Sequence, residues 1–174
     1  MTIEEILADK QLKGKARVKA IGNGLLQRKV GVGELIKIAK DSEPSNRATC
    51  IEALEHATRT DPAIGNAEVL SFLAEALADD APRVKWESAR AIGNIAHQFP
   101  TKLQKAVRNL LENAEHPGKV VRWSAAVALA EIVKLKTSQN KELIPVIESI
   151  MNRCEDESIK KIYRIGLKAV ERKK

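Results

Sequence analysis

The side chains that most often perform chemistry in proteins are scarce in this chain and scattered along it. The three histidines are His56, His97 and His116, and none has a cysteine or carboxylate at the spacing of a metal site. The segment Gly31-Val32-Gly33 lacks the strand and the Lys-Ser/Thr pair of a phosphate-binding loop. No nucleophile elbow is visible either. These features predict a protein that is not an enzyme and that uses no metal and no cofactor.

Two tryptophans, Trp86 and Trp123, are the side chains best suited to binding a macromolecule. They stand 37 positions apart in a chain of which aromatic residues make up only 3%. Tryptophan and arginine are enriched among the residues that dominate binding at protein interfaces, and Arg90 follows Trp86 by one helical turn. Indole rings also stack on nucleic-acid bases. The two rings can act together only if the surrounding elements bring them to one face.

Internal repetition predicts those elements. Residues 84–92 align with 121–129 after a shift of 37 positions, with 159–167 after a further 38, and with 46–54 after 38 in the other direction. Each segment has a basic residue followed by small residues and then by Leu or Ile. A second helical pattern and a short turn rich in acidic residues, Pro or Gly precede each segment. A period of this length indicates a solenoid of stacked helix pairs.

With a diverged opening pair included, the chain contains about five helix pairs. No segment shows the sustained alternation of a half-buried strand. We therefore predict an all-α fold, a right-handed α-α superhelix without β-strands, in one domain spanning residues 1–174. Its repeats are expected at approximately residues 1–30, 31–60, 65–99, 101–137 and 139–174. Pro145 is expected in the first turn of a helix over residues 141–153, where a missing N–H is tolerated.

The repeats resemble HEAT repeats. The resemblance rests on the period of 37–38 residues, on two helices per repeat, on Asp in the inter-helix turn and on Val-Arg/Lys-x-x-Ala-x-x-x-Leu at the start of the second helix. It covers residues 32–172 well and residues 1–31 weakly. The shorter repeats of phycobilin-lyase type and the three-helix armadillo repeats fit less well. The resemblance implies that the second helices line a concave surface, and that Lys85 and Arg122 each meet an acidic turn of a neighbouring repeat.

The second helix of the third repeat has two faces, because an α-helix turns by about 100° per residue. One side is expected to be buried and comprises Val84, Ser88, Ala91, Ile92, Ile95 and Phe99. The other is expected to face solvent and forms a ridge of Trp86, Arg90, Gly93 and His97. The equivalent ridges are Ala48, Glu52, Glu55 and Arg59 in the second repeat, Trp123, Val127, Ala130 and Lys134 in the fourth, and Lys161, Ile165, Lys168 and Arg172 in the fifth.

Ridges that lie side by side on a concave surface would form one binding face. We therefore expect a non-enzymatic scaffold or adaptor that binds a protein or peptide partner there. The residues expected to contact the partner are Trp86, Arg90, His97, Trp123, Val127, Lys134, Lys161 and Lys168. The competing interpretation is that each tryptophan covers the start of its own helix and packs on the preceding turn.

The uneven charge of the chain leaves a second function open. The net charge is +7, with 9 basic and 4 acidic residues in 1–40, 2 and 9 in 41–81, and 19 and 10 in 82–174. The basic C-terminal repeats favour nucleic-acid binding as the alternative, although the acidic second repeat would repel phosphates. HEAT-like DNA glycosylases for alkylated bases are a weaker resemblance, because they use a catalytic Asp that no ridge of repeats three to five contains. Glu87 and Glu131 lie near the ridge but to its side.

The remaining features predict a reduced, cytoplasmic protein; a monomer is expected, although no feature of the sequence fixes the oligomeric state. Cys50 and Cys154 fall three repeats apart, beyond the roughly 7 Å that a disulfide spans between Cα atoms, and Cys50 is expected in the core. No window approaches the roughly 18 apolar residues of a membrane span. The first residues lack the basic and apolar regions of a signal peptide, and no Asn-x-Ser/Thr sequon occurs.

Overall fold

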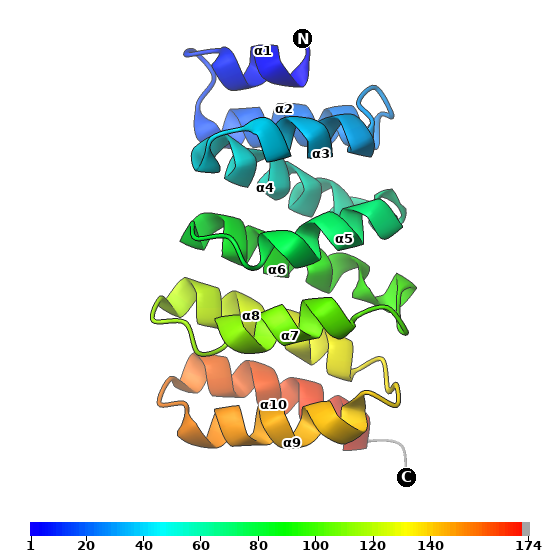
Figure 1. Cartoon of the computed structure of the whole chain (residues 1–174), viewed down its shortest axis with the longest axis vertical. Coiled ribbons are helices and arrows are strands. Elements are labelled where there is room, and N and C mark those ends of the chain that lie inside the picture. Colours follow the sequence, from blue (N-terminus) through cyan, green and yellow to red (C-terminus); the bar gives the residue numbers. More distant parts are fainter. Residues whose placement is uncertain (172–174) are drawn as a thin grey trace.

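The computed structural model describes residues 1–171 as five helix pairs stacked along one axis (Figure 1). The elements are α1 (Ile3–Ala8), α2 (Gly14–Leu26), α3 (Val32–Asp41), α4 (Pro44–Thr60), η1 (Pro62–Ile64), α5 (Ala67–Ala76), α6 (Pro82–Ile95), η2 (Ala96–Gln98), α7 (Gln104–Asn113), α8 (Lys119–Val133), α9 (Asn140–Arg153) and α10 (Glu157–Glu171). Within residues 1–171 there is no β-strand. None of the described helices is both long and apolar enough to cross a membrane. The predicted all-α solenoid is confirmed.

Local signals in the sequence set where several helices begin. At the start of α1, the Thr2 hydroxyl accepts the Glu5 N–H at 3.2 Å, and the Glu5 carboxylate accepts the Thr2 N–H at 2.7 Å. This reciprocal pair satisfies two backbone donors that a helix leaves free at its N-terminus. Pro44 and Pro82 occupy the first positions of α4 and α6, where no intrahelical N–H bond is required. The Asn66 side chain accepts the Val69 N–H at 3.0 Å and begins α5.

Pro145 does not lie in the first turn of its helix, as the sequence predicted. α9 begins at Asn140, so Pro145 falls in the second turn. The helix starts early because the N–H groups of residues 140–142 bond to carbonyls three positions back, which adds a tight first turn. Pro145 cannot donate to the carbonyl of Lys141. It lies on the exposed side of α9, where water can satisfy that carbonyl.

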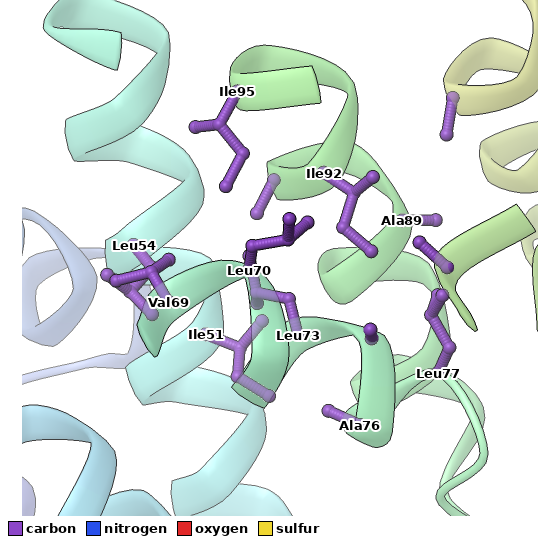
Figure 2. Packing of buried hydrophobic residues seen from close by; sticks show 14 of the residues in the cluster. Ile51, Leu54, Val69, Leu70, Leu73, Ala76, Leu77, Ala89, Ile92 and Ile95 are labelled. Carbon is purple, nitrogen blue, oxygen red and sulfur yellow. The ribbon is translucent and has the colours of Figure 1, made fainter. Parts of the chain in front are cut away.

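The core is continuous along the stack and is filled by aliphatic side chains. Figure 2 shows Ile51 and Leu54 of α4, Leu73 of α5, and Ile92 and Ile95 of α6 gathered between the helices, and each of them is almost fully buried. The predicted buried side of α6 agrees with this arrangement. Val84, Ser88, Ala91, Ile92 and Ile95 are buried, and Phe99 is half-buried beyond the end of the helix.

The second helices α2, α4, α6, α8 and α10 form a layer in which each packs directly on the next. Small residues allow the close approach at two crossings. A Cβ added at Gly166 of α10 would lie 2.9 Å from the Cβ of Ala130 in α8, and one added at Gly93 of α6 would lie 3.7 Å from the Cα of Ala128. The first distance is too short for a methyl group and the second is ordinary van der Waals contact. Gly166 is therefore required at its crossing, whereas Gly93 leaves room.

Both cysteines are free thiols. Cys50 lies in the core, as predicted, and burial raises its pKa to about 11. A thiol with so high a pKa is protonated at neutral pH and is a poor nucleophile.

Candidate binding surface

The exposed side of the layer formed by α2, α4, α6, α8 and α10, called here the second-helix face, carries a shallow groove of about 340 Å³. Its walls come from three neighbouring helices. They comprise Glu55 and Arg59 of α4, Arg90, Gly93 and Asn94 of α6, and Trp123, Val127 and Glu131 of α8. Three of the predicted contact residues, Arg90, Trp123 and Val127, are thus brought together in one groove. Trp86, His97, Lys134, Lys161 and Lys168 do not line it.

Trp123 is the large aromatic side chain that this groove exposes. It is 38% exposed, whereas the aliphatic residues of the second helices are mostly buried in the core. Val127 follows one turn later and is half-buried. A large ring beside an aliphatic side chain, with arginine across the groove, has the composition of an interface anchor.

Trp86 has a different environment from Trp123, although the repeat shift makes them equivalent. Trp86 is half-buried, and its indole N–H donates to the Glu87 carboxylate at 2.9 Å. Trp86 therefore donates to a buried carboxylate of its own helix. The competing interpretation, in which each tryptophan covers the start of its helix and packs on the preceding turn, stays a prediction, with Trp86 the less exposed of the two rings.

Two buried glutamates surround Arg90 beneath the groove. Glu55 and Glu87 are each only 4% exposed. The Arg90 guanidinium lies 3.6 Å from a Glu55 oxygen and 3.7 Å from a Glu87 oxygen, and the Arg59 guanidinium lies 3.8 Å from Glu55. Glu55 was expected on the ridge of the second repeat, but its pairing with Arg90 was not predicted. The sequence nevertheless contains a pattern that predicts such a pair, because the ridges of the second and third repeats carry opposite charges at adjacent positions.

The pKa of Glu87 is raised, first by burial and then by the neighbouring Glu52 and Glu55, while Trp86 and Arg90 oppose the rise. The folded state therefore holds the Glu87 proton more tightly than the unfolded state does. Glu87 costs no stability well below its ordinary pKa of 4.5; the cost grows as pH rises from there to the higher folded-state pKa and is constant above it. Ionised Glu87 thus lowers the stability of the protein at pH 7.

Replacing Glu87 by glutamine should consequently stabilise the protein at neutral pH. Glutamine keeps an oxygen for the Trp86 indole and removes the buried charge, so we expect Tm at pH 7 to rise by about 2–4 °C, which corresponds to about 1 kcal/mol. The gain should disappear in melts at pH 3.5. The matched control is Glu131→Gln, which breaks only a half-exposed pair with Lys134 and should leave Tm nearly unchanged. A lower Tm for Glu87→Gln at pH 7 would show that the Arg90 attraction outweighs burial.

The other predicted contact residues lie outside the groove. His97 is exposed but belongs to the short turn η2, because α6 ends at Ile95. The Lys134 ammonium, just past the end of α8, lies 2.6 Å from the Glu131 carboxylate of that helix. Lys161 and Lys168 are exposed on α10, and Arg172 lies outside the described residues.

Three ridge positions that were expected to face solvent are buried. Ala48 is 1% exposed, Glu55 is 4% exposed and Ala130 is 5% exposed. Ala48 lies in α4, which packs between α2 and α6, and Ala130 meets Gly166 of α10. Ala130 therefore sits at a helix crossing, and the ridge is interrupted there because α8 and α10 approach closely.

Lys85 and Arg122 were predicted to contact acidic turns of neighbouring repeats, and this prediction was wrong, because neither side chain bonds to a carboxylate of the described residues. The Lys85 ammonium donates to the Leu77 carbonyl and to the Asn113 side chain, each at 3.2 Å. The Arg122 guanidinium donates to two carbonyls of the turn just before α8, at 2.8 and 2.9 Å. Both therefore bond to carbonyls at the end of the preceding helix or in the turn after it, groups that helix ends leave free. The expected pair forms instead at Arg47, 2.7 Å from Asp79 of the next repeat.

Metal-binding and glycosylase-like features are missing from the described residues. Within residues 1–171, no group of three His, Cys, Asp or Glu side chains could hold a metal ion. Every aspartate lies in a turn or at a helix end, and none lies within a second helix.

Solved structures of repeat proteins are similar to the fold. A designed armadillo repeat protein matches with a TM-score of 0.73 at 20% identity over 97% of this chain and 80% of its own. A second designed armadillo protein, in complex with the peptide (KR)4, matches with a TM-score of 0.74 at 20% identity over 96% and 79%. The complex of CpcE and CpcF of phycocyanin lyase from Nostoc sp. PCC7120 matches with a TM-score of 0.74 at 20% identity over 95% and 97%. At these identities the similarity shows the fold alone.

Sequence comparison identifies the family. No curated protein matches the chain. A model of HEAT repeats matches residues 8–93 and 32–130, which together cover more than half of the 174 residues. The predicted resemblance is confirmed, and the chain belongs to the HEAT-repeat family.

Proposed function

We propose that this protein is a non-catalytic scaffold that binds a segment of a partner protein on the second-helix face, with Trp123 as the central anchor. The observation that carries the proposal is the exposed Trp123 ring in a groove built from three consecutive repeats. Large side chains in such positions usually contribute most of the affinity of an interface. Val127 beside the ring adds apolar surface, and Arg90 offers a charged donor across the groove.

The shape of the fold supports a protein segment as the ligand. A groove that crosses three helices suits an extended chain better than a compact small molecule. A designed armadillo protein of similar fold forms a complex with a peptide. Nucleic acid is the less favoured ligand, because the arginines that line the groove, Arg59 and Arg90, are already paired with buried glutamates and leave no unpaired cation among the described groove residues for a phosphate backbone.

A random-peptide display selection tests the proposal. Selection on the wild-type protein should enrich peptides whose binding is weakened about 30-fold or more by Trp123→Ala, as expected for loss of a central anchor. Trp123→Ala should leave Tm within a few degrees of wild type, because the ring is substantially exposed. The matched control is Val146→Ser on α9, which removes an exposed apolar side chain, 41% exposed, from a first helix.

Trp123 is preferable to Trp86 for this test, because replacing Trp86 would also leave the Glu87 carboxylate without its indole donor. The proposal fails if no peptide is enriched on the folded protein. It also fails if the enriched peptides bind Trp123→Ala as tightly as wild type, or are lost equally on Val146→Ser.

A further inference from the structure

We infer that the segment bound on the second-helix face is acidic as well as apolar, and that its carboxylates pair with Lys161 and Lys168 of α10. This inference rests on the proposed function and specifies the chemistry of the partner. The inference rests on a comparison of two groups of charged side chains on the face: those that are paired within the protein and those that are not.

The acidic residues in the middle of the face are all paired with cations of the chain. The Glu52 carboxylate lies 2.5 Å from the Arg83 guanidinium. Glu55 and Glu87 both contact Arg90, and Glu131 is paired with Lys134. A basic segment would have to displace these arginines and this lysine before it could reach a carboxylate. The centre of the face therefore offers no net attraction to a basic ligand.

In the described part of the chain, unpaired positive charge remains at both ends of the face, as Lys15 and Lys19 on α2 and as two lysines on α10, and of these two helices only α10 packs directly on the helix that carries Trp123. Lys161 and Lys168 are exposed on α10, and neither has an ion-pair partner among residues 1–171. They stand at i and i+7 with Ile165 between them at i+4, so the three share one side of the helix. Ile165 is 51% exposed. This side of α10 therefore combines an aliphatic side chain with two ammonium groups that have no anion.

The two features lie close enough to engage one short segment. α8, which carries Trp123 and Val127, packs directly on α10, and packed helix axes are about 8–10 Å apart. Gly166 of α10 meets Ala130 of α8, which brings the helices into close contact midway along the face. An apolar side chain docked on Trp123 therefore places the carboxylates of nearby residues within reach of the α10 lysines.

Fluorescence anisotropy with labelled probes of matched length tests this inference. The probes are an eight-residue peptide of alternating Leu and Glu, its Leu-Gln counterpart, the basic (KR)4 peptide, and an oligo(dT) of eight nucleotides. We expect the Leu-Glu peptide to bind more tightly than the other three. Lys161→Glu combined with Lys168→Glu should weaken its binding about tenfold or more at low salt, because attraction becomes repulsion.

The matched control reverses two lysines elsewhere. Lys37→Glu with Lys40→Glu changes the net charge equally but acts on α3, a first helix three repeats away from α10, where both side chains are exposed. It should leave the affinity for the Leu-Glu peptide within about twofold, since exposed charges more than about 10 Å away are screened. An equal loss in this variant would show that overall charge, not the α10 lysines, attracts the peptide, and would overturn the inference.

The remaining outcomes separate this inference from the proposed function. If the Leu-Gln or (KR)4 peptide binds as tightly as Leu-Glu and its binding depends on Trp123, the acidic partner is wrong and the scaffold stands. If oligo(dT) binds most tightly and depends on Trp123 and the α10 lysines, both proposals are overturned in favour of nucleic acid. If no displayed peptide depends on Trp123, the proposed function itself fails.

Discussion

Replacing Gly166 by leucine is expected to separate the last helix pair from the rest of the stack. A Cβ at this position would already lie 2.9 Å from the Cβ and 3.0 Å from the Cα of Ala130. The obstacle includes backbone, which cannot rotate away as a flexible side chain can. We expect a loss of about 3 kcal/mol or more in the free energy of unfolding, because overpacking forces the two helices apart. Even Gly166→Ala should cost about 1–2 kcal/mol, although alanine favours helix by about 1 kcal/mol.

Gly93→Ala is the matched control for this prediction and should have the opposite sign. The added methyl group at Gly93 would make ordinary contact at 3.7 Å from Ala128, so the helix preference of alanine should raise stability by up to about 1 kcal/mol. Urea unfolding gives both free energies. Hydrogen exchange should localise the loss in the Gly166 variants to α9 and α10, because each repeat of a solenoid contacts only its neighbours. Equal effects of alanine at the two glycines would refute the distinction between these crossings.

Replacing Arg90 by alanine is expected to cost about 2–3 kcal/mol at pH 7. Glu55 and Glu87 are both 4% exposed, and removing the guanidinium between them leaves two buried carboxylates facing each other. The cost stays below that of a fully buried pair, because the Arg90 side chain is itself 36% exposed and Arg59 remains near Glu55.

The same cluster supplies a rescue that a general packing defect would not show. Adding Glu87→Gln to Arg90→Ala should restore most of the lost stability at pH 7, since the unpaired buried charge is then gone. The cost of Arg90→Ala alone should also shrink towards pH 4, because the raised pKa of Glu87 allows it to take up a proton there. Thermal melts of the two variants across this pH range measure both effects. A cost that is independent of pH and of Glu87→Gln would mean that Arg90 acts by packing alone.

The period and the pairing of helices were predictable because burial imposes them on the sequence. The buried side of α6 had to be apolar or small at each turn of the helix, and this pattern recurs in every repeat. The prediction of exposed ridge residues failed at Ala48, Glu55 and Ala130, because the pattern of a single helix shows which side is apolar but not which residues the neighbouring helix covers. It also failed to separate Trp86 from Trp123, since the difference depends on a hydrogen bond between adjacent residues and on how much of each ring the neighbouring helix covers.

The charged contacts were the least predictable part of the surface. Sequence pattern indicated that a basic residue opens each second helix, but Lys85 and Arg122 bond to carbonyls rather than to carboxylates. Long flexible side chains can reach several acceptors, and the choice among them depends on distances of a few ångströms between repeats. The pairing of Arg90 with Glu55 likewise joins residues of different repeats, so only the assembled stack brings them together.

The regular spacing of the second helices determines how far apart the anchoring residues of a bound partner segment must lie in its sequence. Neighbouring helices in the layer stand about 8–10 Å apart, and a chain in the polyproline II conformation advances about 3.1 Å per residue with three residues per turn, so that every third side chain lies on the same side. A segment that crosses the helices at right angles therefore meets a new repeat at about every third residue. Its anchoring side chains would recur at every third residue, and the number of anchors would equal the number of repeats that the segment contacts. The spacing of anchoring residues along a bound segment is therefore set by the spacing of the helices. It can be measured in the enriched peptides before any natural partner is known.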